Sequence, residues 1–194
     1  MSLKKKTNQI TVTAMLGAVA SVLMFLEFPI PFLIPPFVKM DFSELPALLA
    51  TFSLGPVSGV AVCLIKNLIH ALNSSTNFVG ELCNFLLGCF LVIPAGIIYK
   101  RNKTRKTALI ATIIGTVAMA VFSIPINYFI SYPFYTSFMP LDDIIAMYQS
   151  LIPSVDGLLA CLIVFNAPFT LLKGALDAVL AFFVYKSLSP MLHR

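Results

Sequence analysis

Hydrophobic residues run along this chain in long stretches, separated by short breaks that are polar or contain proline. A helix that crosses a bilayer needs about 20 apolar residues, and shorter ones occur beside clefts. The pattern therefore predicts an all-α integral membrane protein, a single domain over residues 1–194. It predicts six transmembrane helices at about 10–28, 43–54, 57–72, 80–99, 108–129 and 157–188.

The breaks differ in character. Residues 29–42, PIPFLIPPFVKMDF, are too apolar for an ordinary solvated loop and too rich in proline for a helix. Gly55-Pro56 separates the second and third helices, and the polar turn NSSTNF precedes the fourth. Residues 131–156 form a longer connection with room for a helical part.

Composition supports the membrane assignment. Of the 194 residues, 59% are hydrophobic and 11% are charged, whereas soluble domains carry about 25% charged residues. No polar stretch is long enough for a soluble domain. The first apolar run continues to Phe28 with no small-residue cleavage site after it, so it is interpreted as a retained helix and not as a signal peptide.

The basic residues predict the orientation. Ten of the thirteen Lys and Arg residues lie at 4–6, at 100–106 (KRNKTRK) and at 186 and 194. Basic clusters beside apolar segments mark the cytoplasmic side. Six helices then place both termini and the 100–106 loop in the cytoplasm of a cell-membrane protein, with the proline-rich segment outside. The net charge of +5 follows from this bias and needs no nucleic-acid partner.

Polar side chains inside the sixth helix follow a helical spacing. Asn166, Thr170, Lys173 and Asp177 are spaced i, i+4, i+7 and i+11, which puts them on one face. A charge at the bilayer centre costs roughly 3 kcal/mol even on lenient scales. The presence of Lys173 in this span therefore calls for a functional or structural role.

Three other helices carry similar faces. They are Ser123, Asn127 and Ser131 on the fifth helix, Glu81, Asn84 and Gly88 on the fourth, and Lys66 and His70 on the third. With the assigned orientation these faces converge toward the exterior, which predicts a buried solute-binding site.

Purely structural roles are the alternative for each residue. Lys173 has Asp177 at i+4 as a partner within its own helix. Asn127 could act as interhelical glue worth about 0.6 kcal/mol. Glu81 suits a helix N-terminus, and Lys66 and His70 could snorkel to the interface. None of these roles explains why several helices carry an amide or a charge at similar depth.

Sequence signatures of enzymes are missing. The chain has no GxxxxGK[ST] phosphate loop, and no HExxH, GxSxG or zinc-binding pattern. Its four cysteines lie singly in apolar segments, where cysteine behaves as a small hydrophobe, so neither a disulfide nor a metal site is expected. We therefore expect a binding protein without a cofactor of its own.

The first helix carries small residues four apart, Ala14 with Ala18 and Gly17 with Ser21. Such faces allow a second helix to approach closely. The face serves either packing within the protein or docking of a membrane partner.

Four segments together resemble the substrate-binding S components of energy-coupling factor transporters, and most of all the riboflavin-specific members. They are KMDFSELPALLATFSLGPVSGVAVCLIKNLIH, GELCNFLLGCFLVIPAGIIYKRNKTRK, INYFISYPFY and PFTLLKG. The resemblance covers about residues 10–190.

This resemblance implies six helices and a high-affinity vitamin site near the outer surface. It implies that the proline-rich segment, with Phe37, Lys39 and Asp41, lies over that site. It also implies partners: a membrane T subunit and two cytoplasmic ATPases, which use the ATP. Ala14 and Ala18 match the family's AxxxA docking motif.

The same resemblance assigns ligand contacts. Asn127 matches a riboflavin-contacting amide, and Lys173 matches the lysine of the last helix. The family's FNLIKG has an asparagine where this chain has Thr170, and Asn166 lies one turn earlier. Glu81 and Asn84 complete the candidate substrate-binding residues.

Riboflavin suits this inventory, because it is neutral, with an apolar ring edge, a uracil-like edge and a hydroxylated tail. Pockets are mostly apolar with a few convergent polar groups. Biotin, pantothenate and thiamin remain alternative vitamins. A structural membrane protein, an intramembrane enzyme or a channel are the alternatives outside this class.

Overall fold

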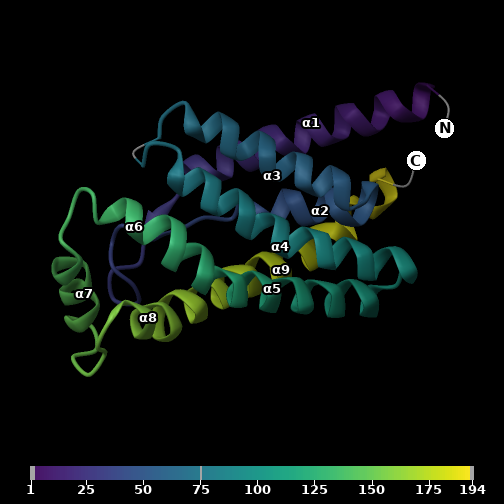
Figure 1. Cartoon of the computed structure of the whole chain (residues 1–194). Helices are drawn as coiled ribbons and strands as arrows, with labels where there is room; N and C mark the ends of the chain where they lie inside the picture. The colour runs from purple at the N-terminus through teal and green to yellow at the C-terminus, as the bar shows by residue number, and fades with distance from the viewer. Residues whose placement is uncertain (1–2, 75, 193–194) are drawn as a thin grey trace.

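The computed structural model describes residues 3–74 and 76–192, and most of this part of the chain is helical. The long helices lie alongside one another in a bundle (Figure 1). Two π-helical turns, η1 and η2, each continue directly into a neighbouring helix. The helical elements are α1 (Leu3–Phe25), α2 (Glu44–Leu54), α3 (Pro56–Ala71), α4 (Val79–Arg101), α5 (Arg105–Ile126), η1 (Asn127–Ser131), α6 (Tyr132–Tyr135), α7 (Leu141–Gln149), α8 (Leu158–Cys161), η2 (Leu162–Asn166) and α9 (Ala167–Leu192).

Four helical runs in the described part are long and apolar enough to cross a membrane. They are Leu3–Phe25, Val79–Arg101, Arg105–Tyr135 and Leu158–Ala181. Helices α2 and α3 are apolar but shorter. Large apolar side chains stay exposed on the outside of these helices, as on α5, where Ile113 is 52% and Val121 is 56% exposed. Such extensive apolar surface is unfavourable in water, so it is consistent with contact between these helices and lipid.

Some helix ends differ from those that hydropathy predicts. α1 begins at Leu3 and not near residue 10, because its first turns are polar and hydropathy does not detect them. The fifth helical run continues past residue 129 to Tyr135 through η1, although Pro133 lies within it. Proline is tolerated there because it stands in the first turn of α6. The long connection contains the helix α7.

The proline-rich segment is ordered by a small antiparallel hairpin. Strand β1 (Phe28–Pro29) pairs with β2 (Lys39–Met40), so that Phe28 faces Met40. Ile34 and Met40 are fully buried, which anchors the segment onto the helices. Hydropathy does not predict this hairpin, since two-residue strands leave no alternating pattern.

The buried apolar residues form two clusters. The first includes Ala47, Leu48 and Leu91, from α2 and α4. The second includes Ile34, Tyr132 and Tyr148, from the proline-rich segment, α6 and α7. Close packing supports the first cluster: a Cβ added at Gly115 of α5 would lie 2.4 Å from the carbonyl oxygen of Leu91, so only glycine lets α4 and α5 approach this closely.

The two ends of the bundle are chemically distinct. The start of α1, the end of α9 and the basic connection between α4 and α5 lie at one end (Figure 1). The proline-rich segment, α6, α7 and α8 lie at the other end (Figure 1). The sequence predicts the polar faces on the side away from the basic clusters, which is this second end.

Candidate functional site

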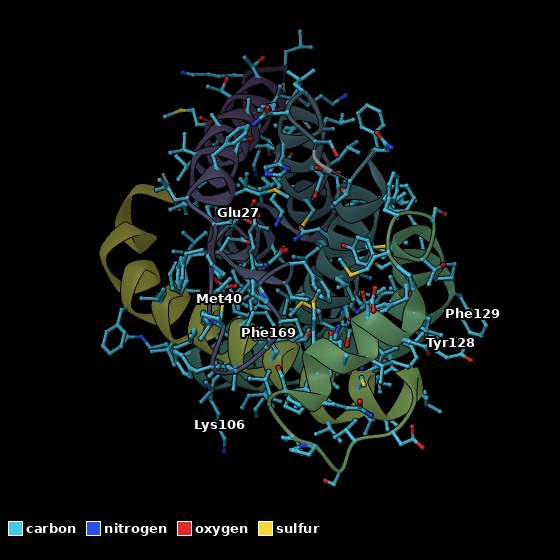
Figure 2. The ribbon with its side chains drawn as sticks, turned by 90° about the vertical axis from the view of Figure 1, so that its left-hand side faces the viewer. Glu27, Met40, Lys106, Tyr128, Phe129 and Phe169 are labelled. Carbon is cyan, nitrogen blue, oxygen red and sulfur yellow. The ribbon has the colours of Figure 1, made fainter. Side chains whose placement is uncertain are left out.

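A cavity of about 200 Å³ opens among the helices near the proline-rich segment. Met40 of that segment and Phe169 of α9 lie close to the centre of the view onto this end (Figure 2). The lining residues come from α1 to α6, η1, η2, α9 and the proline-rich segment: Met24, Glu27, Phe37, Val38, Lys39, Asp41, Glu44, His70, Thr76, Gly80, Glu81, Cys83, Asn84, Leu87, Met119, Asn127, Ser131, Tyr132, Tyr135, Asn166, Phe169, Thr170 and Lys173.

An ion pair joins α9 to the proline-rich segment at this cavity. The Lys173 ammonium donates to Oδ2 of Asp41 at 2.6 Å, and the Asp41 residue is only 3% exposed. Burial raises the pKa of Asp41, but Lys173, Lys66 and the hydrogen bond from Ser43 outweigh it and hold the pKa below its ordinary value. Asp41 is therefore an ionised acceptor at neutral pH.

A second buried ion pair continues from the first. Ser43 donates its backbone N–H to Asp41 at 2.8 Å, and Lys66 of α3 donates to the Ser43 hydroxyl at 2.6 Å. Lys66 also donates to Glu44 of α2 at 2.6 Å, and neither side chain is more than 2% exposed. These bonds tie α9, the proline-rich segment, α2 and α3 into one polar chain.

Asn166 is held by two tyrosines. The Tyr148 hydroxyl of α7 donates to Asn166 Oδ1 at 2.8 Å, and Asn166 Nδ2 donates to the Tyr132 hydroxyl at 3.3 Å. The two tyrosine hydroxyls also hydrogen-bond to each other. Because its partners are themselves buried, the Asn166 amide has a fixed orientation at the cavity wall.

Aromatic rings close the outer wall. Phe37 of the proline-rich segment makes edge contacts with Tyr132, Tyr135 and Tyr148, at ring-centroid distances of 6.4, 5.7 and 6.2 Å. Edge-to-face pairs at these distances are favourable. The proline-rich segment is therefore held over the cavity by ring packing as well as by the Asp41 ion pair.

A polar cluster forms the opposite rim. Glu81 at the start of α4 accepts from His70 Nδ1 at 2.9 Å, from Ser74 at 2.8 Å and from Thr76 at 3.1 Å. Glu27, just after α1, pairs with Lys39. Three hydrogen bonds from neighbouring side chains thus fix the Glu81 carboxylate in place.

The two π-helical turns place amides at the cavity. Asn127 begins η1 and Asn166 ends η2, and both line the cavity. A π-turn inserts an extra residue into a helix and is frequent at functional sites. Asn84 of α4 also lines the cavity, and its Oδ1 is buried with no hydrogen-bond partner in the described protein. That acceptor is left without a hydrogen bond by the protein atoms around it.

The structure brings together the substrate-binding residues predicted from sequence. Asn127, Asn166, Thr170, Lys173, Glu81 and Asn84 all line this cavity, as do Phe37, Lys39 and Asp41 of the proline-rich segment. The Thr170 hydroxyl donates to the carbonyl of Asn166 at 2.7 Å. Ala14 and Ala18 lie elsewhere, exposed on the outer surface of α1, whereas Gly17 and Ser21 are buried.

Two of the purely structural roles considered for the polar residues, those of Lys173 and Lys66, differ from what the structure shows. Lys173 does not pair with Asp177, because Asp41 accepts its hydrogen bond instead. Lys66 does not snorkel to an interface, since it is fully buried against Glu44 and lies outside the cavity lining. Only His70 of that pair reaches the cavity.

Sequence reasoning missed the residues that orient the predicted ones. The sequence did not predict a role at the cavity for four residues: Glu27, Glu44, Tyr132 and Tyr148. The signal was weak, because the tyrosines lie in the long connection, which hydropathy leaves unassigned. No group of three or more His, Cys, Asp or Glu side chains within residues 3–74 and 76–192 is arranged to hold a metal ion.

Comparison with known proteins places the fold. Residues 8–185 match the family model "ECF transporter, substrate-specific component". The riboflavin transporter RibU of Staphylococcus aureus (strain TCH60) is 37% identical over 194 residues, covering 100% of this chain and 96% of the relative. The riboflavin transporter FmnP of Bacillus subtilis (strain 168) is 30% identical, covering 97% and 96%.

A solved structure agrees with these relatives. It is described as "Structure and mechanism of the S component of a bacterial ECF transporter", is 33% identical and superposes with a TM-score of 0.77. The alignment covers 97% of this chain and 99% of that one. This family is a transporter component and not an enzyme. The chain is an all-α, multi-pass membrane protein that belongs to the family of substrate-specific (S) components of ECF transporters.

Proposed function

We propose that this protein binds riboflavin with high affinity at the outer face of the cell membrane and presents it to an energy-coupling complex. The observation that supports this most is a cavity walled by aromatic rings and edged by amides. Asn84, Asn127 and Asn166 supply donors and acceptors for the uracil-like edge and the hydroxylated tail. Full-length relatives that are riboflavin transporters support the same ligand.

The charges around the cavity favour a neutral ligand. Each charged side chain in the lining already has a partner: Lys173 with Asp41, Lys39 with Glu27, Glu44 with Lys66, and Glu81 with His70. A carboxylate ligand such as biotin or pantothenate would bring an uncompensated charge close to four carboxylates. Riboflavin brings none, so its binding leaves these pairs intact.

Orientation and partners follow from the family and the basic clusters. Six spans, counting α2 and α3, would put both termini and the α4–α5 connection in the cytoplasm. The cavity then faces outward beneath the proline-rich segment, with Phe37, Lys39 and Asp41 over the ligand. The exposed Ala14 and Ala18 suit docking to a membrane T subunit, and two ATPases would supply ATP hydrolysis. The chain would need no cofactor of its own.

Spectroscopy of the protein purified in mild detergent tests this proposal. A bound flavin absorbs visible light, and denaturation should release it in a one-to-one ratio. Protein stripped of flavin should quench the fluorescence of added riboflavin, and Asn127→Leu should weaken this quenching more than tenfold. A colourless protein that quenches no riboflavin, yet binds labelled biotin or pantothenate, would refute the ligand assignment.

A further inference from the structure

The partner of Lys173 lies on the proline-rich segment and not on a helix. This segment forms one wall of the cavity. The cavity measures about 200 Å³, whereas pockets for drug-sized ligands span about 300–1,000 Å³, so a vitamin needs a wider cavity than this one. Outward movement of the proline-rich segment would widen the cavity and would carry Asp41 away from Lys173.

That movement would strand a charge. The Lys173 side chain is only 11% exposed, and Asp41 is the one acceptor within hydrogen-bond distance of it among the described residues. Removing one partner of a buried ion pair is strongly destabilising. Without a substitute acceptor, the open arrangement would be rarely populated and ligand exchange would be slow.

A substitute lies one helical turn away. Asp177 stands at i+4 from Lys173 on α9 and is 0% exposed. Neither of its carboxylate oxygens has a hydrogen-bond partner among the residues that the structure describes. Side chains at i and i+4 of a helix meet, so an ammonium can reach it by a change of rotamer.

The neighbouring acids Glu44 and Asp41 both accept hydrogen bonds from side chains, in contrast to Asp177. Glu44 accepts from Lys66, and Asp41 accepts from Lys173 and Ser43. Lys66 is itself held by both Glu44 and Ser43, so it is not free to serve Asp177. A buried polar group with no partner calls for a functional explanation.

We propose that Asp177 is the second acceptor for Lys173, used when Asp41 leaves with the proline-rich segment. In this role Asp177 is a positioning residue: it touches no ligand and lies outside the cavity lining. It lowers the barrier to opening by keeping the ammonium paired throughout. This inference rests on the proposed riboflavin site, and it extends that proposal to the rate of ligand exchange.

Stopped-flow measurement of riboflavin quenching on Asp177→Leu tests the proposal. Association and dissociation rates should both fall about tenfold, because the open arrangement loses a charged hydrogen bond. The equilibrium Kd should change less than threefold, since the closed arrangement does not use Asp177. Asp177→Asn should give an intermediate effect, because its carbonyl oxygen still accepts.

A matched control separates this role from general packing. Thr116 of α5 also buries a polar atom, which has no hydrogen-bond partner in the described part of the chain, and it packs against Gly174 of α9. Thr116→Val should leave both rates within twofold of wild type. Unchanged rates in Asp177→Leu would overturn the proposal. So would a melting temperature that is lower in both Asp177→Leu and the near-isosteric Asp177→Asn, because the carboxylate itself would then stabilise the closed arrangement.

Amide hydrogen exchange provides a test that needs no riboflavin. Exchange at residues 38–43 reports opening of the proline-rich segment and should be slower in Asp177→Leu than in wild type. Equal or faster exchange would refute the role of Asp177 by itself. Wild-type protein that quenches no riboflavin would refute the proposed function and leave the exchange result to decide on Asp177.

Discussion

Replacing Lys173 with methionine is the most informative single change at this site. The substitution keeps much of the side-chain volume and leaves Asp41, which is 3% exposed, without its ammonium partner. Breaking a buried pair from one side costs about 3–5 kcal/mol. Ser43 still donates its N–H to Asp41, so we expect a loss near the lower end, about 3 kcal/mol.

The loss should be visible as thermal stability. For a chain of this size, 1 kcal/mol shifts the melting temperature by about 2–4 °C, so Lys173→Met should melt roughly 6–12 °C below wild type. The double variant Asp41→Leu/Lys173→Met should recover most of this loss, because two apolar groups replace a buried pair at little cost. Fluorescence-detected size-exclusion chromatography after heating measures both.

Riboflavin affinity then separates two roles of Lys173. If the ammonium touches the ligand, affinity falls more than tenfold in Lys173→Met and stays low in the double variant. If it only holds the proline-rich segment, the double variant binds about as poorly as Asp41→Leu alone. A Lys173→Met protein with wild-type melting temperature and affinity would refute the importance of this ion pair altogether.

Four further variants test other parts of the molecule. Asn166→Leu removes the amide that bonds the Tyr132 and Tyr148 hydroxyls, which keep only their bond to each other, and should weaken riboflavin binding at least tenfold in a fluorescence titration. Unchanged affinity would remove Asn166 from the site. Leucine at Ala14 or Ala18, both exposed, should leave binding by the isolated protein intact but abolish riboflavin uptake by cells, and normal uptake would exclude docking there. Gly115→Val places a side chain against the Leu91 carbonyl and should lower the melting temperature by several degrees, whereas an unchanged value would show that α4 and α5 can separate.

The hydrophobic pattern predicts long apolar helices and shows which polar residues share a face of a helix. Long apolar runs predict helices whatever packs against them, and i, i+4 spacing identifies a shared face. Asn166, Thr170 and Lys173 could thus be assigned to one side of α9, and that side does face the cavity. The resemblance to S components added the expected ligand contact of Asn127 and the expected position of the proline-rich segment over the site.

The hydrophobic pattern does not predict ion pairs or hydrogen bonds between residues that are far apart in the sequence. The ion pair of Lys173 joins residues 132 positions apart, and Asp177 at i+4 was the nearer candidate. Tertiary placement of Asp41 decided between them. The tyrosines around Asn166 escaped notice for a similar reason, because Tyr148 comes from α7, in a connection with no membrane-length run.

The division of the core into two clusters suggests how a ligand can be admitted without loosening the bundle. The first cluster packs α2, α4 and α5 and includes no residue of the proline-rich segment. The second contains Ile34 and Met40 of that segment together with Tyr132 and Phe169, so it alone is disturbed when the segment swings outward. Movement of the segment would therefore leave the packing of the first cluster in place. Helix α9 connects the two clusters, because Phe169 belongs to the second and Ala181 to the first, and Lys173 between them holds Asp41 of the proline-rich segment.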